Sequence, residues 1–393
     1  MDVKRAVSRR GFMGGVTTAL GVLTLRPDGS LWAQAAQAAA PRQGRSEDAY
    51  DAMAKIGNNE NPYGPSEAVM KAMTNAFKYS MRYGYPDGGI TDAIAKHHNL
   101  KPENVMLGAG SGEILQVVAQ TYLRGEKKVV GSDPTYNSVF SAATNIKADP
   151  IKVPLLPDYN QDVPGLIRAT RQNYSQLGFL YLCSPNNPTG NILTKDQIKQ
   201  ILDSIPEDVP VLIDEAYHHY VEDPAYATSV PYVAEGRKVI IARTFSKING
   251  MAGMRLGYAV APRDLIQEMR PFSTGSINAI VKWGGVAALK DVESMEKIKR
   301  EAITLREKTT GELKSLGFAC IPSQTNFFMV HLKKPVVPVI EEFRKKQVIV
   351  GRPFPPMNEH LRVSIGTPQE MDRFMVAFKE IMLPTKTASK SNS

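Results

Sequence analysis

The pattern of hydrophobic and polar residues along the chain separates predicted strands from predicted helices. Six short, nearly continuous apolar runs predict buried strands at residues 104–107, 128–131, 178–183, 209–213, 238–242 and 257–261. Such runs are typical of strands that are covered on both faces. Helix-length segments lie between them, including 111–123 and 195–205, the latter with Thr194 as its predicted N-cap. This alternation predicts an α/β fold with a mostly parallel sheet.

A different pattern begins near residue 286. A long charged helix is predicted over 294–316, followed by short strands around 325–331 and 361–365 and by a helix from Gln369. The length of 393 residues allows one or two domains. We expect an N-terminal arm with part of the small domain, a large domain, a smaller α+β domain and a disordered polar tail, at residues 41–75, 76–285, 286–383 and 384–393 respectively.

The first forty residues have the features of a targeting segment. Arg9 and Arg10 precede a short apolar stretch at 14–25, and small-residue cleavage sites of the Ala-x-Ala kind follow. The paired arginines resemble a twin-arginine export signal, which predicts an exported, periplasmic protein. The apolar stretch is shorter than the roughly twenty residues that a membrane-spanning helix needs, so no stable span is expected. The alternatives are a disordered extension of a cytoplasmic protein or an organellar transit peptide.

Charge and cysteine usage exclude several classes of function. The formal net charge is +9, and the first forty residues contribute five basic side chains against two acidic ones. A modest positive excess suits anionic small molecules. The chain has no Lys/Arg-rich run with interleaved aromatic residues, so nucleic-acid binding is not expected. Its two cysteines lack metal-ligand spacing, so no metal site is expected either.

Polar clusters follow three of the predicted strands. They are the segment 184–190 (Ser-Pro-Asn-Asn-Pro-Thr-Gly), the segment 214–217 (Asp-Glu-Ala-Tyr), and the segment 244–247 (Thr-Phe-Ser-Lys) with Arg255 eight residues further on. Taken singly, each has a plain structural explanation: an Asn-Pro turn, a carboxylate at a strand end, a solvated lysine. Because ligand sites in open α/β sheets lie at the carboxyl ends of the strands, the three clusters together predict one shared crevice.

Four further segments complete a family resemblance that runs from about Lys55 to Met382. They are residues 59–65 (Asn-Glu-Asn-Pro-Tyr-Gly-Pro), 85–87 (Tyr-Pro-Asp), 134–136 (Pro-Thr-Tyr) and 361–367 (Leu-Arg-Val-Ser-Ile-Gly-Thr). With the three clusters, this set resembles the class I/II aminotransferases that depend on pyridoxal 5′-phosphate (PLP), most closely the histidinol-phosphate aminotransferase-like branch. The resemblance implies an aspartate aminotransferase-like fold, with a mostly parallel seven-stranded sheet in a large PLP-binding domain, and a homodimer with shared active sites.

The resemblance assigns catalytic roles to residues of the three clusters. Lys247 matches the lysine that binds the cofactor covalently and later moves a proton to and from the substrate. Asp214 matches the carboxylate that keeps the pyridine nitrogen protonated, which the cofactor needs in order to act as an electron sink. Asn187 and Tyr217 match the groups that hydrogen-bond the phenolic oxygen of the ring, and Tyr136 matches the aromatic side chain stacked on it.

The phosphate of the cofactor requires hydrogen-bond donors and positive charge. Gly110, Ser111 and Gly112 precede a predicted helix, and the backbone N–H groups of such a helix start suit an anion. The resemblance adds Ser246 and Arg255 as further phosphate ligands. At Gly112 the histidinol-phosphate branch usually has an aspartate, so the chain departs from the pattern there.

Substrate binding and the subunit interface are also implied by the resemblance. Arg362 matches the arginine that binds the acidic group of the substrate through two hydrogen bonds. Arg352 lies near a second arginine of the histidinol-phosphate enzymes, or is a surface residue. Asn61 stands where some members have a tyrosine that contacts the substrate phosphate. Tyr85 matches a tyrosine that reaches the cofactor phosphate from the other subunit of the dimer.

The expected reaction is the transfer of an amino group between an amino acid, or an amine like histidinol phosphate, and a 2-oxo acid. A PLP-dependent lyase, decarboxylase or racemase on the same fold is the second hypothesis, because these reactions share the fold's motifs. A non-catalytic PLP-binding protein is the third. The presence of Lys247, Asp214 and Arg255 together argues against it.

Overall fold

The computed structural model describes residues 47–383, of which 53–383 belong to one compact unit. The short helix α3 (Glu47–Asp51) belongs to a separate N-terminal unit and is described by itself. The predicted export signal at 1–40 and the predicted tail at 384–393 lie outside the described residues. Among the helices of the described chain, none is long and apolar enough to cross a membrane.

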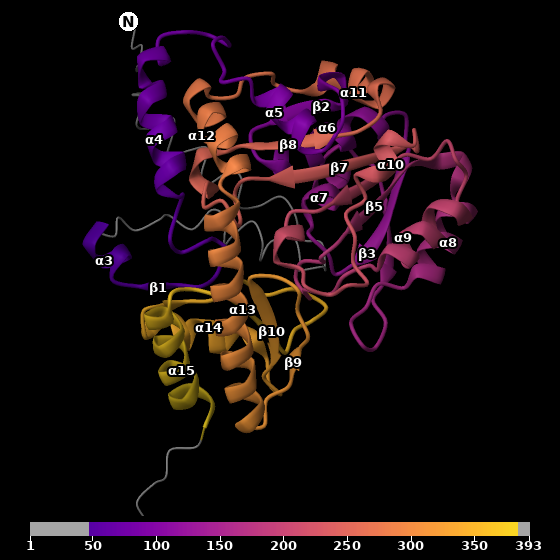
Figure 1. Ribbon diagram of the computed structural model, residues 1–393. Helices are drawn as coiled ribbons and strands as arrows, with labels where there is room; N and C mark the ends of the chain where they lie inside the picture. Colours follow the sequence, from indigo (N-terminus) through magenta and orange to yellow (C-terminus); the bar gives the residue numbers. More distant parts are fainter. Residues whose placement is uncertain (1–46, 384–393) are drawn as a thin grey trace, which may run out of the picture. The chain divides into compact units, whose positions relative to one another are not determined.

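A seven-stranded sheet forms the centre of the larger part of this unit (Figure 1). Its spatial order is β2 (Val105–Gly108), β8 (Gly257–Val260), β7 (Val239–Thr244), β6 (Val211–Asp214), β5 (Leu177–Cys183), β3 (Lys128–Asp133) and β4 (Pro150–Pro154). Strand β8 is antiparallel to both of its neighbours, and all other neighbouring strands are parallel. The predicted α/β fold with a mostly parallel seven-stranded sheet is therefore confirmed.

Helices cover both faces of this sheet. Successive strand residues point to opposite sides, so a strand of mostly apolar residues presents an apolar surface on each face. On β6, Val211 and Ile213 belong to one hydrophobic core, whereas Leu212 belongs to the other. The first core is closed by α4 (Glu67–Ala76), α5 (Ile90–His97), α8 (Val163–Gln172), α9 (Lys195–Ser204), α10 (Pro231–Ala234) and α12 (Ala279–Lys290). The second is closed by α6 (Ser111–Tyr122), α7 (Ser138–Asn145) and α11 (Arg263–Met269). Thr194 caps α9 as predicted, accepting a hydrogen bond from the Gln197 amide at 3.1 Å.

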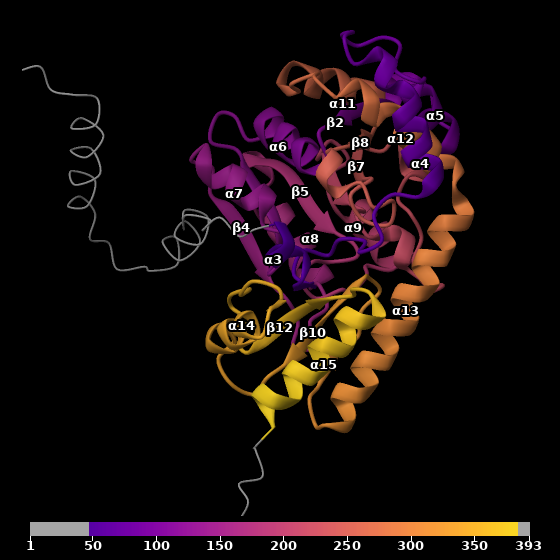
Figure 2. The same cartoon turned by 90° about the vertical axis from the view of Figure 1, so that its left-hand side faces the viewer.

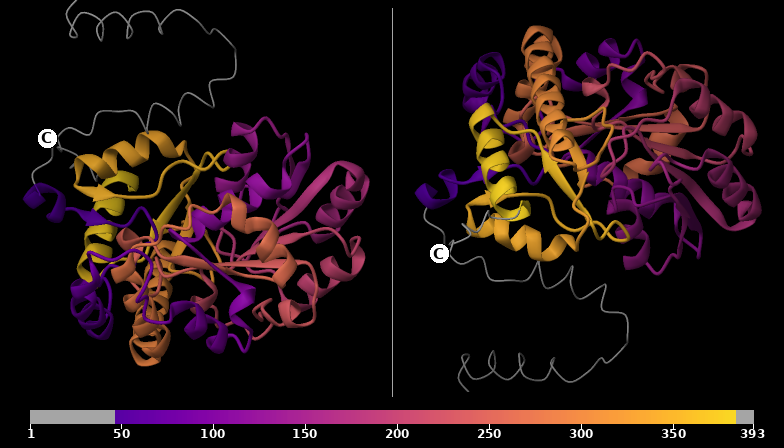
Figure 3. Two further views of the ribbon diagram at one scale, coloured as in Figure 1. Left: turned by 90° about the horizontal axis from the view of Figure 1, so that it is seen from above. Right: turned by 90° about the horizontal axis from the view of Figure 1, so that it is seen from below.

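A smaller α+β part packs around a core of its own (Figure 2). Its antiparallel sheet has the order β12 (His360–Ser364), β10 (Phe327–His331) and β9 (Cys320–Ile321), and β1 (Ala54–Lys55) pairs in parallel with β11 (Val348–Ile349). The helices α13 (Val292–Ser315), α14 (Val336–Lys345) and α15 (Pro368–Met382) complete it. Views from above and below show these yellow and orange elements beside the magenta strands of the large sheet (Figure 3).

Candidate active site

The carboxyl ends of β5, β6 and β7 bring the predicted catalytic residues together. Asp214 is the last residue of β6, Asn187 lies four residues after β5, and Lys247 lies three residues after β7. The Asn187 amide donates to the Tyr217 hydroxyl at 3.4 Å, and the Lys247 amine lies 5.5 Å from the centre of the Tyr217 ring. The three polar clusters therefore converge on one place, as the sheet topology requires.

Asp214 is a buried carboxylate without a cationic partner. Its side chain is 2 % exposed, and its Oδ1 accepts a hydrogen bond from the Ala216 amide at 3.1 Å. No other described residue hydrogen-bonds this side chain or pairs with its charge. Burial raises the pKa of Asp214 to about 7, although the Ala216 amide and the charge of Lys247 oppose the rise. A protonated ring nitrogen beside this carboxylate would supply the missing partner, so Asp214 fits the pyridine of PLP.

The environment of Lys247 lowers the pKa of its amine toward neutral pH. Burial, followed by the positive charge of Arg362, lowers the pKa of its amine to about 8. The amine donates to the Asn58 carbonyl oxygen at 3.2 Å. Within residues 47–383 no carboxylate forms an ion pair with it. An amine with a lowered pKa is the kind of nucleophile that covalent binding of an aldehyde cofactor requires.

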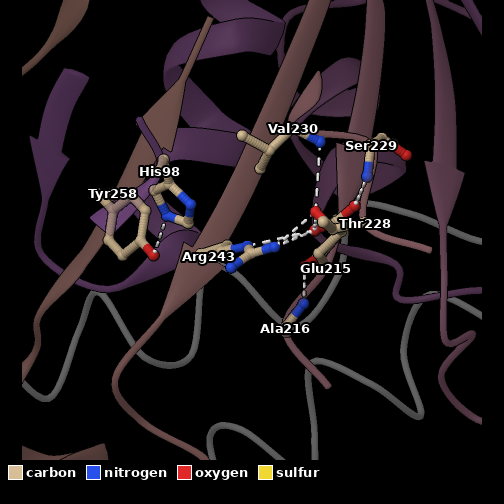
Figure 4. Close-up of polar contacts among 9 residues, drawn as sticks. His98, Glu215, Ala216, Thr228, Ser229, Val230, Arg243 and Tyr258 are labelled. Atoms are coloured by element: carbon tan, nitrogen blue, oxygen red, sulfur yellow. Dashed lines mark hydrogen bonds and ion pairs between the residues drawn. The ribbon is translucent and has the colours of Figure 1, made fainter. Parts of the chain in front are cut away.

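A buried ion pair fixes the strand ends that carry these residues (Figure 4). Arg243 on β7 donates to Glu215, the neighbour of Asp214, at 2.7 Å, and their side chains are 4 % and 1 % exposed. The Glu215 carboxylate also accepts from the Ser229 amide at 2.6 Å and the Thr228 hydroxyl at 2.8 Å. Because every charge in this pair is hydrogen-bonded, the pair holds β6 and β7 in one arrangement beneath the site.

The residues predicted to bind the cofactor phosphate lie at the start of α6. Arg255 donates to the Ser246 hydroxyl at 3.2 Å and to the Ala109 carbonyl oxygen at 3.1 Å, so it joins the loop after β7 to the loop before α6. Gly110 precedes the helix with φ of +80°, and a Cβ there would come within 2.2 Å of the Arg255 guanidinium. Only glycine fits this position. No carboxylate pairs with Arg255 in the described chain, so its charge is available to an anion.

The first turn of α6 leaves room for a ligand. A Cβ added at Gly112 would meet no atom within 4 Å. With no side chain at this position, the backbone N–H groups of the first turn, which point along the helix axis, suit an anion. Gly110, Ser111 and Gly112 thus fit the phosphate role predicted for them, together with Ser246 and Arg255.

Arg362 on β12 is a buried guanidinium without an acidic partner. It is 7 % exposed, donates to the Gly57 carbonyl oxygen at 2.6 Å and to Asn187 Oδ1 at 2.8 Å, and leaves its Nε without a partner. No described carboxylate pairs with it. Burial lowers the pKa of Arg362 to about 10. Since a buried charge is costly unless it is paired, this guanidinium fits an anionic ligand.

Arg352 and Arg362 share one aromatic neighbour. The two guanidinium groups lie 4.2 and 4.6 Å from the centre of the Phe354 ring. Arg352 is exposed and donates to the Pro353 carbonyl oxygen at 3.0 Å. Desolvation lowers the pKa of Arg352, and the nearby Tyr136 opposes this effect. The two arginines therefore provide positive charge at the same edge of the site.

Tyr136 belongs to the same electrostatic neighbourhood. Its side chain is 39 % exposed. Burial and then the negative charge of Asp214 raise the pKa of Tyr136, whereas the charges of Arg255 and Arg352 oppose the rise. The ring thus lies among the residues predicted to contact the cofactor and the substrate, with a surface left for a stacked ring.

Within the described chain, no hydrogen bond joins Asn61 or Tyr85 to another candidate site residue. The Asn61 side chain hydrogen-bonds the backbone: it donates to the carbonyl oxygen of Ile248, the residue after Lys247, at 2.9 Å and accepts from the Tyr63 amide at 3.1 Å. Its predicted substrate contact stays a prediction. Tyr85 is 81 % exposed, and none of the described hydrogen bonds or ring contacts joins it to the site.

Sequence reasoning gave no role to Asn59, although it opens the matching segment 59–65. The side chain is 1 % exposed and hydrogen-bonds both Tyr217 and Ser364. An asparagine in the left-handed region, here with φ of +57°, is uncommon enough to attract attention, but φ is not visible in a sequence. The signal that was available was its place in the Asn-Glu-Asn-Pro motif.

The fold and the site together define a PLP-dependent enzyme built on the aspartate aminotransferase-like fold. Residues 52–378 match the family model "Aminotransferase class I and II", and the chain belongs to this family. It is 33% identical to the histidinol-phosphate aminotransferase of Caldicellulosiruptor saccharolyticus over 84% of this chain and 91% of the relative. It is 34% identical to the histidinol-phosphate aminotransferase of Moorella thermoacetica over 84% of this chain and 85% of the relative.

A solved structure shows the same fold. The histidinol-phosphate aminotransferase of Sinorhizobium meliloti in complex with pyridoxal-5′-phosphate superposes with a TM-score of 0.79 at 23% identity, covering 92% of this chain and 99% of that one. Family membership, the matching relatives and the fit of the site to PLP agree. The protein is a PLP-dependent aminotransferase that moves an amino group between an amino donor and a 2-oxo acid.

Proposed function

We propose that the amino donor carries a compact anionic group, a phosphate or a carboxylate, that Arg362 binds with the help of Arg352. The observation that carries this proposal is the buried Arg362 guanidinium, which lacks an acidic partner among the described residues and has a free Nε. The names of the relatives point to histidinol phosphate as one such donor. A phosphate or carboxylate can accept two parallel hydrogen bonds from a guanidinium, which fixes orientation as well as affinity.

The remaining site residues take the following roles in this proposal. When bound, PLP supplies an electron sink for the electrons of the bond broken at the donor's α-carbon. Lys247 would hold the cofactor and, once free of it, would carry a proton to and from the donor's α-carbon. Asp214 would keep the ring nitrogen protonated, and Tyr217 and Asn187 would hydrogen-bond the phenolic oxygen. Ser246, Arg255 and the start of α6 bind the cofactor phosphate.

Substitution of Arg362 tests the substrate proposal. Arg362→Ala should lower kcat/KM for anionic donors by roughly tenfold to a few hundredfold, because it removes a charge-assisted pair. Simple amines should be affected much less, because they do not use the pair. Arg362→Lys should restore little, since one ammonium cannot reproduce the planar fork. The measurement is the half-reaction of a panel of donors, including histidinol phosphate and acidic and aromatic amino acids, followed by cofactor absorbance. Equal losses for acidic donors and plain amines would contradict the proposal.

We propose further that two copies of the chain form a homodimer with shared active sites. The support is a set of large apolar side chains at the end of α4 and just after it: Phe77, Met81, Tyr83 and Tyr85 are 60 %, 71 %, 103 % and 81 % exposed. Large exposed apolar side chains that follow one another closely along the chain, as in this segment 77–85, are typical of an interaction surface. In the dimer, Tyr85 would reach the cofactor phosphate of the partner subunit.

We propose that residues 1–40 direct export through a twin-arginine-type signal and that the mature enzyme works in the periplasm. The support is sequence alone: Arg9 and Arg10, the apolar stretch at 14–25 and the small-residue cleavage sites. An enzyme that must enclose a cofactor while it folds is suited to a pathway that carries folded cargo.

A further inference from the structure

The hydroxyl oxygen of Tyr217 accepts hydrogen bonds from two side-chain amides. Asn59 Nδ2 donates to it at 2.9 Å and Asn187 Nδ2 donates to it at 3.4 Å. A hydroxyl has one hydrogen to donate and two lone pairs to accept with, so both lone pairs are in use. None of the described residues accepts a hydrogen bond from this buried hydroxyl, which leaves its hydrogen for a ligand.

Residues of β12 fix the direction of both amides. The Ser364 hydroxyl accepts from the Asn59 backbone amide at 2.8 Å and donates its single hydrogen to Asn59 Oδ1 at 2.8 Å. The Asn59 oxygen therefore faces Ser364, and its NH₂ group faces Tyr217. Two residues earlier on β12, Arg362 donates to Asn187 Oδ1 at 2.8 Å and turns the Asn187 NH₂ group the same way. Two equivalent supports thus hold one phenol from two sides.

We propose that Asn59, held by Ser364, is a positioning residue that directs the hydroxyl hydrogen of Tyr217 to the phenolic oxygen of PLP. The inference rests on the proposed role of Tyr217 at that oxygen. Asn59 touches neither cofactor nor substrate in this role and acts only through Tyr217. The backbone carbonyl oxygen of Asn59 accepts from Asn326 Nδ2 at 3.1 Å, which fixes the backbone here, while the bond from Ser364 restrains the side-chain amide. Pre-organisation of this kind prevents the hydroxyl from donating elsewhere.

The proposal predicts an effect on the proton equilibrium of the bound cofactor. A hydrogen bond donated to the phenolic oxygen stabilises its negatively charged form, so it lowers the pH at which the cofactor's absorbance changes. When this donor is lost, the midpoint of the cofactor's pH-dependent absorbance change should rise by about one to two pH units. A role for Asn59 in folding alone would leave this midpoint where it is.

Asn59→Asp is the decisive variant, studied as the purified holoenzyme. The new carboxylate can only accept, so it would take the hydrogen of Tyr217 and withdraw it from the cofactor. Aspartate tolerates the left-handed backbone of this position, where φ is +57°. Ser364→Ala is the second variant: it releases the Asn59 amide and should shift the midpoint in the same direction by a smaller amount, whether or not Asn59→Asp folds.

A double-mutant cycle of Asn59→Asp and Tyr217→Phe separates the effect on the orientation of the Tyr217 hydroxyl from the effect of the added negative charge. If Asn59 acts through the hydroxyl, Asn59→Asp should raise the midpoint more in the wild-type background than in the Tyr217→Phe background. The two shifts should differ by at least about one pH unit, which is a tenfold difference in proton affinity. A shift of equal size in both backgrounds reports only the added charge and overturns the inference. An unchanged midpoint overturns it too, because it means that Tyr217 already donates to Asn59. If Tyr217→Phe by itself leaves the midpoint unchanged, the failure lies in the proposed role of Tyr217 and not in that of Asn59.

Discussion

At the scale of single residues, the site is defined by charges that are buried without a partner. Burial costs an ionised group several kcal/mol unless another charge or hydrogen bonds compensate. This cost lowers the pKa of Lys247 to about 8 and raises the pKa of Asp214 to about 7, because burial favours the neutral form of each group. Perturbed groups that lie together in one crevice are typical of active sites, and both shifts suit the roles in PLP binding that are proposed for these residues.

Lys247→Ala should abolish both turnover and the long-wavelength absorbance of the purified protein. The alanine has no amine, so the cofactor has no covalent attachment and the proton carrier at the α-carbon is absent. Absorbance spectra and treatment with borohydride, which makes the attachment permanent, measure the effect. If borohydride still fixed the cofactor to the variant at another lysine, the assignment of Lys247 would be wrong.

Asp214→Asn should change the pH dependence of stability in the apoprotein. The folded-state pKa of Asp214 is about 7 against an ordinary value of 3.8, so between these pH values the folded state binds more protons than the unfolded state. The contribution of Asp214 to stability therefore falls as pH rises from about 4 to 7. Asparagine has no such titration, so the variant should gain stability over the wild-type apoprotein across this window.

The measurement is the difference in free energy of unfolding between the two apoproteins, taken in denaturant at several pH values. The difference cancels other titrations, including those of His98, His219 and His360, whose lowered pKa values make stability rise with pH over part of the same range. In the holoenzyme, Asp214→Asn should instead slow transamination by orders of magnitude. A difference that stays constant from pH 4 to 7 would show that Asp214 is not perturbed.

At the scale of elements, apolar runs predicted strands well where both faces are covered. Six of the seven strands of the large sheet overlap the predicted runs. The seventh, β4, was not predicted. It is an edge strand with the sequence Pro-Ile-Lys-Val-Pro, and only Val153 in it is buried. An edge strand with one covered face has too few apolar residues to stand out from a loop.

The site was predicted to the extent that it follows from strand order. A parallel sheet brings its strand ends to one edge, so local motifs after β5, β6 and β7 sufficed to place Asn187, Asp214 and Lys247. The hydrogen bonds of Asn59 to Tyr217 and Ser364 span 158 and 305 residues of sequence, and no local pattern encodes such pairs. The packing of Phe354 against Arg362, eight residues further along the chain, likewise depends on how the intervening segment folds.

The ion pair of Arg243 and Glu215 shows how elements position the site. Both residues flank positions that are predicted to be catalytic: Glu215 follows Asp214, and Arg243 lies four residues before Lys247. A hydrophobic pair of similar volume could stabilise the fold equally well or better. The pair, with its additional bonds to Thr228 and Ser229, instead specifies one relative placement of β6 and β7. Precise placement matters here, since small displacements of catalytic groups are costly in rate.

At the scale of the whole molecule, the export proposal predicts where the protein accumulates. Arg9→Lys combined with Arg10→Lys should retain the protein in the cytoplasm of a bacterial host, because the paired arginines are the proposed recognition element. Fractionation into periplasm and cytoplasm, followed by immunoblotting, measures the distribution. Arg26→Lys is the matched control, since it makes the same chemical change outside the pair. Periplasmic accumulation of the double variant would show that the pair is not the signal.

The dimer proposal links assembly to cofactor binding. The wild-type protein should sediment as a species of two chains. Met81→Asp combined with Tyr83→Asp places two charges in the exposed apolar segment 77–85, where burial in an interface would be unfavourable, so the variant should sediment as a single chain. It should also bind PLP more weakly, since Tyr85 of the partner would no longer reach the phosphate. Val376→Asp, at another exposed apolar position (59 %), is the control and should change neither property. A wild-type protein that sediments as one chain, or a double variant that remains a dimer with full cofactor affinity, would refute the shared-site arrangement.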